Sequence, residues 1–76
     1  MNIDHLIKMA NDIGAFFAAE SDTEEAVRGI AQHLTRFWDP RMRRQIVAHW
    51  RTGGEGLREP VKRAVELLAE AERVSG

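Results

Sequence analysis

The sequence contains no cysteine, which excludes two devices that small proteins use to stay folded. Neither a disulfide nor a thiolate metal site can form without it. A domain of 76 residues buries only roughly 60–65% of the surface that its unfolded chain exposes, so its stability is marginal. Regular helix packing or a partner must then supply the stability that cross-links cannot. We expect residues 1–76 to form a single domain.

Long apolar runs are also missing. No run approaches the 18 or so residues of a membrane-spanning helix. The opening residues, MNIDHLIKMAND, bring acidic and basic side chains too early for the apolar region of a signal peptide. We therefore expect a cytoplasmic location and no contact with a membrane.

Net charge is small, at −1, but it is unevenly placed. Residues 1–35 carry six acidic and two basic side chains, whereas residues 36–51 carry five arginines and one aspartate. The basic segment RMRRQIVAHW superficially resembles a DNA recognition helix, so a small DNA-binding regulator that uses helix 40–52 is the alternative function. Its arginines spread around the helix and the pI is about 6.3, which argues against nucleic acid as the partner.

Apolar residues recur at helical spacing, and no stretch alternates over the length of a strand. The pattern predicts an all-α fold, a small bundle of four short helices. Ser21 and Glu24 match a capping box for the second helix, and Asp39-Pro40 is a start signal for the third. The expected helices are residues 2–18 with Asn2 as N-cap, 21–37, 40–52 and 60 onward. The residues expected to face inward are Ile3, Leu6, Ile7, Ala10, Ile13, Phe17, Ala26, Val27, Ile30, Leu34, Trp38, Met42, Ile46, Val47, Trp50, Val61, Ala64, Val65, Leu68 and Ala71.

The first helix has a wider apolar face than one core requires. Met9 and Phe16 flank its inward stripe and widen the apolar arc to roughly 200°, against about 100° for an ordinary surface helix. Gly14 lies on the same arc and would let another backbone approach closely. Two interpretations are open. Either the first helix is simply central and buried, or Met9 and Phe16 complete a partner surface.

The third helix carries an arginine inside its apolar stripe. Arg43 must be paired if it is buried, and Asp39, four residues earlier, is within reach. The alternative is that Arg43 crosses an interface to a carboxylate of a partner. Arg41 and Arg44 lie on the other side of the helix, where they could hold an acidic surface.

Catalytic and metal-binding patterns are weak. His5 and Asp12 share one side of the first helix, but a third ordinary ligand is missing. No serine is placed with a base to activate it. The segment GGEG lacks the lysine and the preceding strand of a phosphate-binding loop. The sequence predicts no catalytic, cofactor-binding or metal-binding residue.

Three segments carry a specific resemblance. HLIKMANDIGAFF at 5–17, GIAQHLTRFWDPRMRRQIVAHW at 29–50 and the following GGEGL resemble the small delta subunit of soluble, NAD-dependent, molybdenum-containing formate dehydrogenases. The similarity extends over about residues 1–68. It implies that the large subunits carry a molybdenum bis-guanine-dinucleotide cofactor, iron–sulfur clusters and FMN, and that this chain carries none of them.

The resemblance implies an accessory subunit that supports assembly, maturation or stability of an enzyme oxidising formate to CO2 with NAD reduction. Its expected partners are the large catalytic (alpha) subunit and the other formate dehydrogenase subunits. In isolation the chain could also form a homo-oligomer to cover its apolar arc. The residues predicted to bind a partner are Met9, Phe16, Trp38, Arg41, Arg43 and Arg44.

Overall fold

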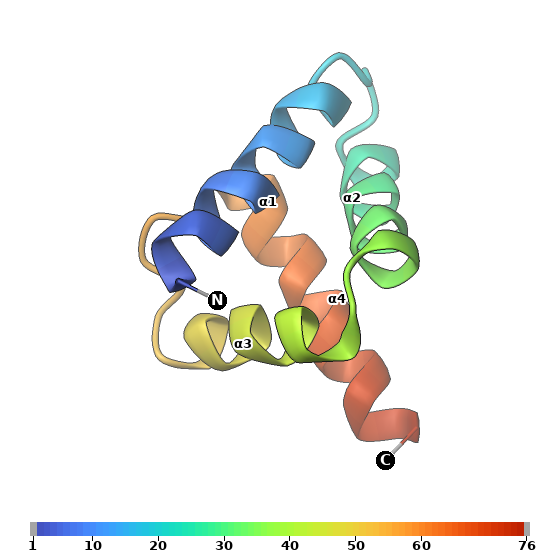
Figure 1. The fold of residues 1–76 in the computed structure, drawn as a ribbon. Coiled ribbons are helices and arrows are strands. Elements are labelled where there is room, and N and C mark those ends of the chain that lie inside the picture. The colour runs from blue at the N-terminus through green and yellow to red at the C-terminus, as the bar shows by residue number, and fades with distance from the viewer. Residues whose placement is uncertain (1, 76) are drawn as a thin grey trace.

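Four helices make up the fold in the computed structural model, which describes residues 2–75, with side chains as far as residue 73. They are α1 (Ile3–Phe17), α2 (Thr23–Phe37), α3 (Pro40–Arg51) and α4 (Glu59–Ser75). Helices α1 and α2 meet at their connecting loop, α3 crosses their open end, and α4 runs behind them and extends beyond α3 (Figure 1). The predicted all-α bundle of four short helices is confirmed, and the described residues contain no strand.

Two of the predicted N-caps are confirmed. The side chain of Asn2 accepts a hydrogen bond of 2.8 Å from the backbone N–H of Asp4 at the start of α1. At the start of α3, Asp39 accepts one of 3.0 Å from the N–H of Met42, and Pro40 occupies the first helical position. These side chains satisfy backbone donors that the first turn of a helix leaves unpaired.

The start of α2 differs from the prediction by one residue. Asp22, and not Ser21, is the N-cap, and its carboxylate accepts hydrogen bonds from the N–H groups of Glu24 and Glu25. The prediction of a capping box between Ser21 and Glu24 was therefore wrong. A carboxylate is a stronger acceptor than a hydroxyl, and its negative charge suits the positive end of the helix dipole, so Asp22 displaces the serine.

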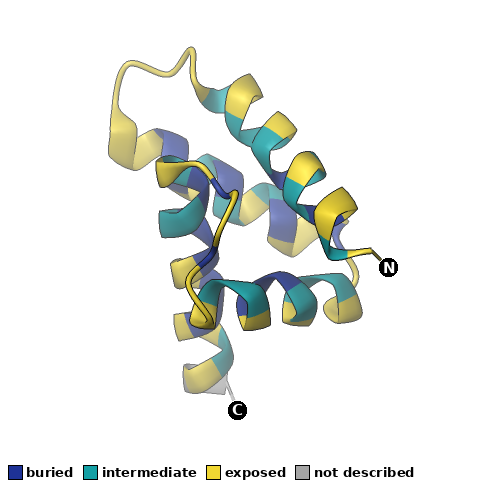
Figure 2. Ribbon diagram, turned by 90° about the vertical axis from the view of Figure 1, so that its left-hand side faces the viewer, coloured by how far each residue is buried: buried dark blue, intermediate teal, exposed yellow. Residues whose placement is uncertain are grey.

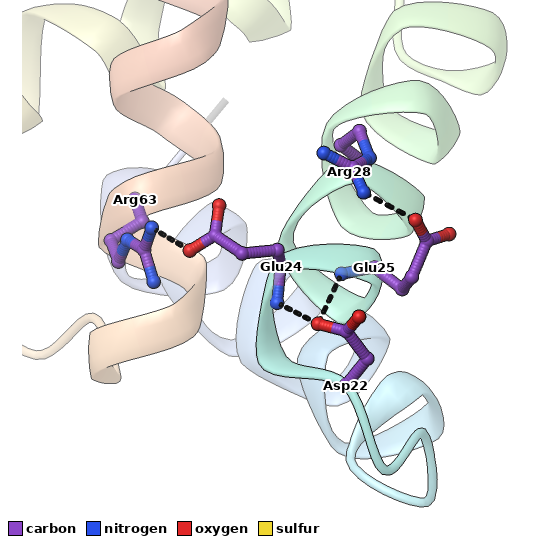
Figure 3. Close-up of polar contacts among 5 residues, drawn as sticks. All are labelled: Asp22, Glu24, Glu25, Arg28 and Arg63. Atoms are coloured by element: carbon purple, nitrogen blue, oxygen red, sulfur yellow. Dashed lines mark hydrogen bonds and ion pairs between the residues drawn. The ribbon is translucent and has the colours of Figure 1, made fainter.

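The acidic first turn of α2 is also held by two arginines (Figure 3). Glu24 pairs with Arg63 of α4 and so ties the two helices together, while Glu25 pairs with Arg28 one turn further along α2. The hydrogen bond that Arg28 donates to the carboxylate of Glu25 raises the pKa of Arg28 above its ordinary value. A raised arginine pKa adds stability that is fully present at neutral pH and is lost only in strongly alkaline solution, so this pair makes no pH switch near neutrality.

The core contains the stripes that the sequence predicts. Every predicted inward position of α2 is buried, and those of α1 and α3 are buried or pack against the buried cluster. Helix α4 is rotated slightly from expectation, because Ala69 is buried and Ala71 is exposed. Figure 2 shows the buried positions on the inward sides of the helices and exposed positions throughout the loop between α1 and α2.

Gly14 lets α4 approach α1 closely in this core. A Cβ atom at Gly14 would lie 2.5 Å from Cγ2 of Val61, which is closer than real side chains pack. Val61 is almost fully buried and cannot move aside. The close approach that Gly14 permits is therefore used by α4 of the same chain, which explains part of the wide apolar arc of α1.

Candidate functional site

Trp38 lies at the corner between α2 and α3, as predicted. Its backbone N–H donates to the carbonyl of Leu34 at 3.1 Å and ends α2, and Asp39 then caps α3. The residue is only 4% exposed and belongs to the hydrophobic core. The folded chain thus leaves the indole ring almost no surface for a partner, and its contribution to partner binding stays a prediction.

Arg43 does not pair with Asp39 as the sequence suggested. Its guanidinium Nη1 donates to the carbonyl of Thr35 at 3.1 Å and to the carbonyl of Trp38. The described residues contain no ion pair between Arg43 and Asp39, whose carboxylate caps α3 instead. The cation therefore satisfies carbonyls at the C-terminal end of α2, where the helix dipole favours positive charge.

Arg41 and Arg44 behave differently from Arg43. Both side chains are exposed, and together with Asp39 and Pro40 they line an open hollow of about 470 Å3. Within the part of the chain that the structure describes, neither guanidinium has a hydrogen bond or an ion pair. We call Arg41 and Arg44 the arginine corner. It offers two cations that the fold itself does not use.

Met9 and Phe16, the two residues that widen the apolar arc of α1, differ in how far they are exposed. Met9 is half-buried and packs against the core, which agrees with a central first helix. Phe16 is 79% exposed, at the C-terminal end of α1. Of the two, only Phe16 presents a large apolar surface to solvent.

Phe16 continues into an aromatic strip over the outer side of α2. Its ring lies edge-on to Phe17, with 5.2 Å between centroids, and His33 lies 4.6 Å from Phe37. Phe17 and Phe37 line the same hollow of about 160 Å3, so the two pairs are neighbours. We call Phe16, Phe17, His33 and Phe37 the aromatic strip. Phe37 is 69% exposed, yet sequence reasoning did not select it as a site residue.

The position of Phe37 on α2 gave no signal that could have found it. Phe37 lies three residues after Leu34 and seven after Ile30, so a helical wheel places it beside the inward stripe. A large aromatic residue at the end of an amphipathic helix has two outcomes, cover by another element or exposure to a partner. The structure shows exposure.

Comparison with known proteins identifies the family of this chain. A family model described as "NADH-dependant formate dehydrogenase delta subunit FdsD" matches residues 5–65. The chain belongs to the formate dehydrogenase delta subunit family. No curated protein and no solved structure shows significant similarity to it. The matched segment of this delta subunit includes the arginine corner and the whole aromatic strip.

Two further polar side chains of the delta subunit, those of His49 and Asn11, have hydrogen-bond partners within the fold. His49 donates from Nε2 to the carbonyl of Glu55 at 2.7 Å, since a carbonyl only accepts. Asn11 of α1 donates to the carbonyl of Gly56 at 2.9 Å and accepts from the N–H of Arg58 at 3.0 Å. The GGEG segment is thus a turn fixed to α1, and its glycines supply the positive φ angles that the turn needs.

Two further findings concern other classes of site in the delta subunit. Among residues 2–75, no three His, Cys, Asp or Glu side chains gather closely enough to hold a metal ion. His5 and Asp12 are both exposed on α1. None of the described helices combines the length and the apolar composition that crossing a membrane requires.

Proposed function

We propose that this delta subunit is a non-catalytic accessory protein of a cytoplasmic NAD-dependent formate dehydrogenase. It docks on the large catalytic (alpha) subunit and supports assembly, maturation or stability of the complex. The partner subunits carry the molybdenum bis-guanine-dinucleotide cofactor, the iron–sulfur clusters and FMN, and they oxidise formate to CO2 with reduction of NAD. The family match supports the membership, and the surface of the chain supports docking.

One observation carries the docking proposal. The fold exposes two phenylalanine rings, Phe16 at the end of α1 and Phe37 at the end of α2, and two arginines on α3 that have no partner among the described residues. Fully burying such a ring contributes about 1.5–3 kcal/mol, so a lone domain of this size gains nothing from leaving both in water. Aromatic residues and arginine are also the side chains that protein interfaces favour.

The arginine corner gives the first test. Replacing Arg41 and Arg44 together with Ala should change the free energy of unfolding by no more than about 1 kcal/mol, because both side chains are exposed and unpaired. Binding to the complex of the other formate dehydrogenase subunits should weaken and lose part of its salt dependence, since rim charges steer association. Titration calorimetry at low and high salt, with a thermal melt of each protein, measures both effects.

Arg43→Ala is the comparison variant. Its guanidinium holds two carbonyls at the end of α2, so its loss should lower the free energy of unfolding by about 1–3 kcal/mol while leaving the salt dependence of binding unchanged. If replacing Arg41 and Arg44 leaves the binding affinity unchanged, the arginine corner is no part of the docking surface. A salt-dependent shift of duplex DNA by the wild-type chain, without binding to the enzyme subunits, would favour the DNA-binding alternative instead.

A further inference from the structure

A third hollow lies along α2 and shares Gln32 and Arg36 with the hollow of the aromatic strip. It is a groove of about 480 Å3 between α2 and α4. Its α4 wall consists of Leu67, Leu68 and Ala71. Leu67 is 38% exposed, and it is the third large apolar side chain, after the two phenylalanines, that the described residues leave open to solvent.

The α2 wall is formed by Ala31, Gln32, Thr35 and Arg36. The hydroxyl of Thr35 already donates to the carbonyl of Ala31 at 2.8 Å, so this wall is less polar than its sequence suggests. Arg36 is the single charged residue among those lining the groove. It also lines the hollow of the aromatic strip, and within residues 2–75 its guanidinium has neither a hydrogen bond nor an ion pair.

We infer that this groove binds an amphipathic, acidic helix of a partner formate dehydrogenase subunit, an inference that rests on the proposed function. Apolar side chains of that helix lie against Leu67 and Leu68, and a carboxylate beside them pairs with Arg36. The charge of the occupant follows from Arg36, which is the one charged side chain among the described residues that line the groove and has no partner among them. A helix with both apolar and acidic side chains therefore contacts the leucines and pairs with Arg36 at the same time.

The walls also explain why the occupant is a helix. Both walls are α-helices, whose backbone N–H and C=O groups bond within each helix, so no free strand edge is available to an extended peptide. The lining positions on α2 and α4 recur one turn apart, which leaves a furrow between two rows of side chains. Such a furrow accepts side chains spaced i and i+4 on a facing helix.

Binding of two groove variants to the delta-free complex of the other subunits tests the inference. Leu67→Asp and Arg36→Glu should each weaken binding at least about tenfold, because one puts a charge against apolar side chains and the other repels the carboxylate. Arg36→Lys should stay within about threefold of wild type. Arg51→Glu, at the far end of α3, changes net charge equally and controls for general steering. Thermal melts establish that each variant is folded.

Cross-linking then identifies the occupant. Because the chain lacks cysteine, Gln32→Cys takes a single benzophenone label on the groove rim, and Glu20→Cys takes the same label in the exposed loop after α1. The rim label should reach one acidic helical segment of a partner subunit, and the loop label should not.

Each other result overturns the inference. Groove variants that bind like wild type, or cross-links to a second copy of this chain or scattered over several segments, contradict the groove while leaving the proposed function standing. Failure of the wild-type chain itself to bind contradicts both.

Discussion

Replacing Trp38 with Ala is expected to lower the free energy of unfolding by about 3–5 kcal/mol, the largest effect of any single change considered for this chain. The ring is 4% exposed and packs where α2 ends and α3 begins, so its removal leaves a cavity at the corner. A domain of this size has a total stability of about 4–11 kcal/mol, so the loss is a large share of it. The melting temperature should fall by at least about 12 °C.

Trp50→Ala is the matched control for this prediction. The same side chain is removed, but Trp50 is only half-buried at the end of α3, so the loss of stability should be clearly smaller. Thermal melts followed by circular dichroism measure both variants. If Trp38→Ala melts like wild type, or if it folds normally but fails to bind the complex, then Trp38 acts at an interface and the core assignment is wrong.

Replacing both Phe16 and Phe37 with Ser is expected to weaken binding to the complex by at least about 30-fold for each ring. Interface anchors of this type contribute about 2 kcal/mol or more each when truncated, which corresponds to that factor. Stability should change by only about 0.5 kcal/mol for each ring, because both are largely exposed in the isolated chain. Titration calorimetry measures the affinity, and chemical denaturation measures the stability.

The control for this pair keeps the rings in place. Phe16→Tyr with Phe37→Tyr retains flat apolar faces of the same width and should bind within about tenfold of wild type. Binding of the serine variant within threefold of wild type would remove the aromatic strip from the docking surface. Unfolding of the serine variant would show that the two rings stabilise the domain instead.

Most of the fold was predictable, because the helices of this chain are amphipathic and end at explicit signals. Asp39-Pro40 and Asn2 act as expected, since local chemistry alone determines a cap. The cap of α2 was missed by one residue, because Ser21 and Asp22 are both good caps, they sit side by side, and the capping-box pattern favoured the serine. The partner of Arg43 was missed because the carbonyls that it binds converge only once α2 and α3 have turned at Trp38.

The candidate site was less predictable for a related reason. Phe37 and Trp38 are consecutive aromatic residues at the end of one helix, yet one is exposed and the other is in the core. Which of the two rings is covered depends on where α1 and α3 pass, and a helical wheel for α2 contains no information about that. The same holds for Met9 and Phe16, which share one helix face but differ in how far the rest of the fold covers them.

The proposed function requires this chain to dock on the other subunits of a formate dehydrogenase without supplying catalytic groups. Sedimentation velocity of the purified chain, alone and mixed with the delta-free complex, tests it most directly. We expect the chain to carry no stoichiometric molybdenum, iron, flavin or zinc, to show no formate oxidation alone, and to co-sediment with the complex at one defined stoichiometry. A chain that sediments separately from the complex at micromolar concentration, or that oxidises formate by itself, would contradict the account.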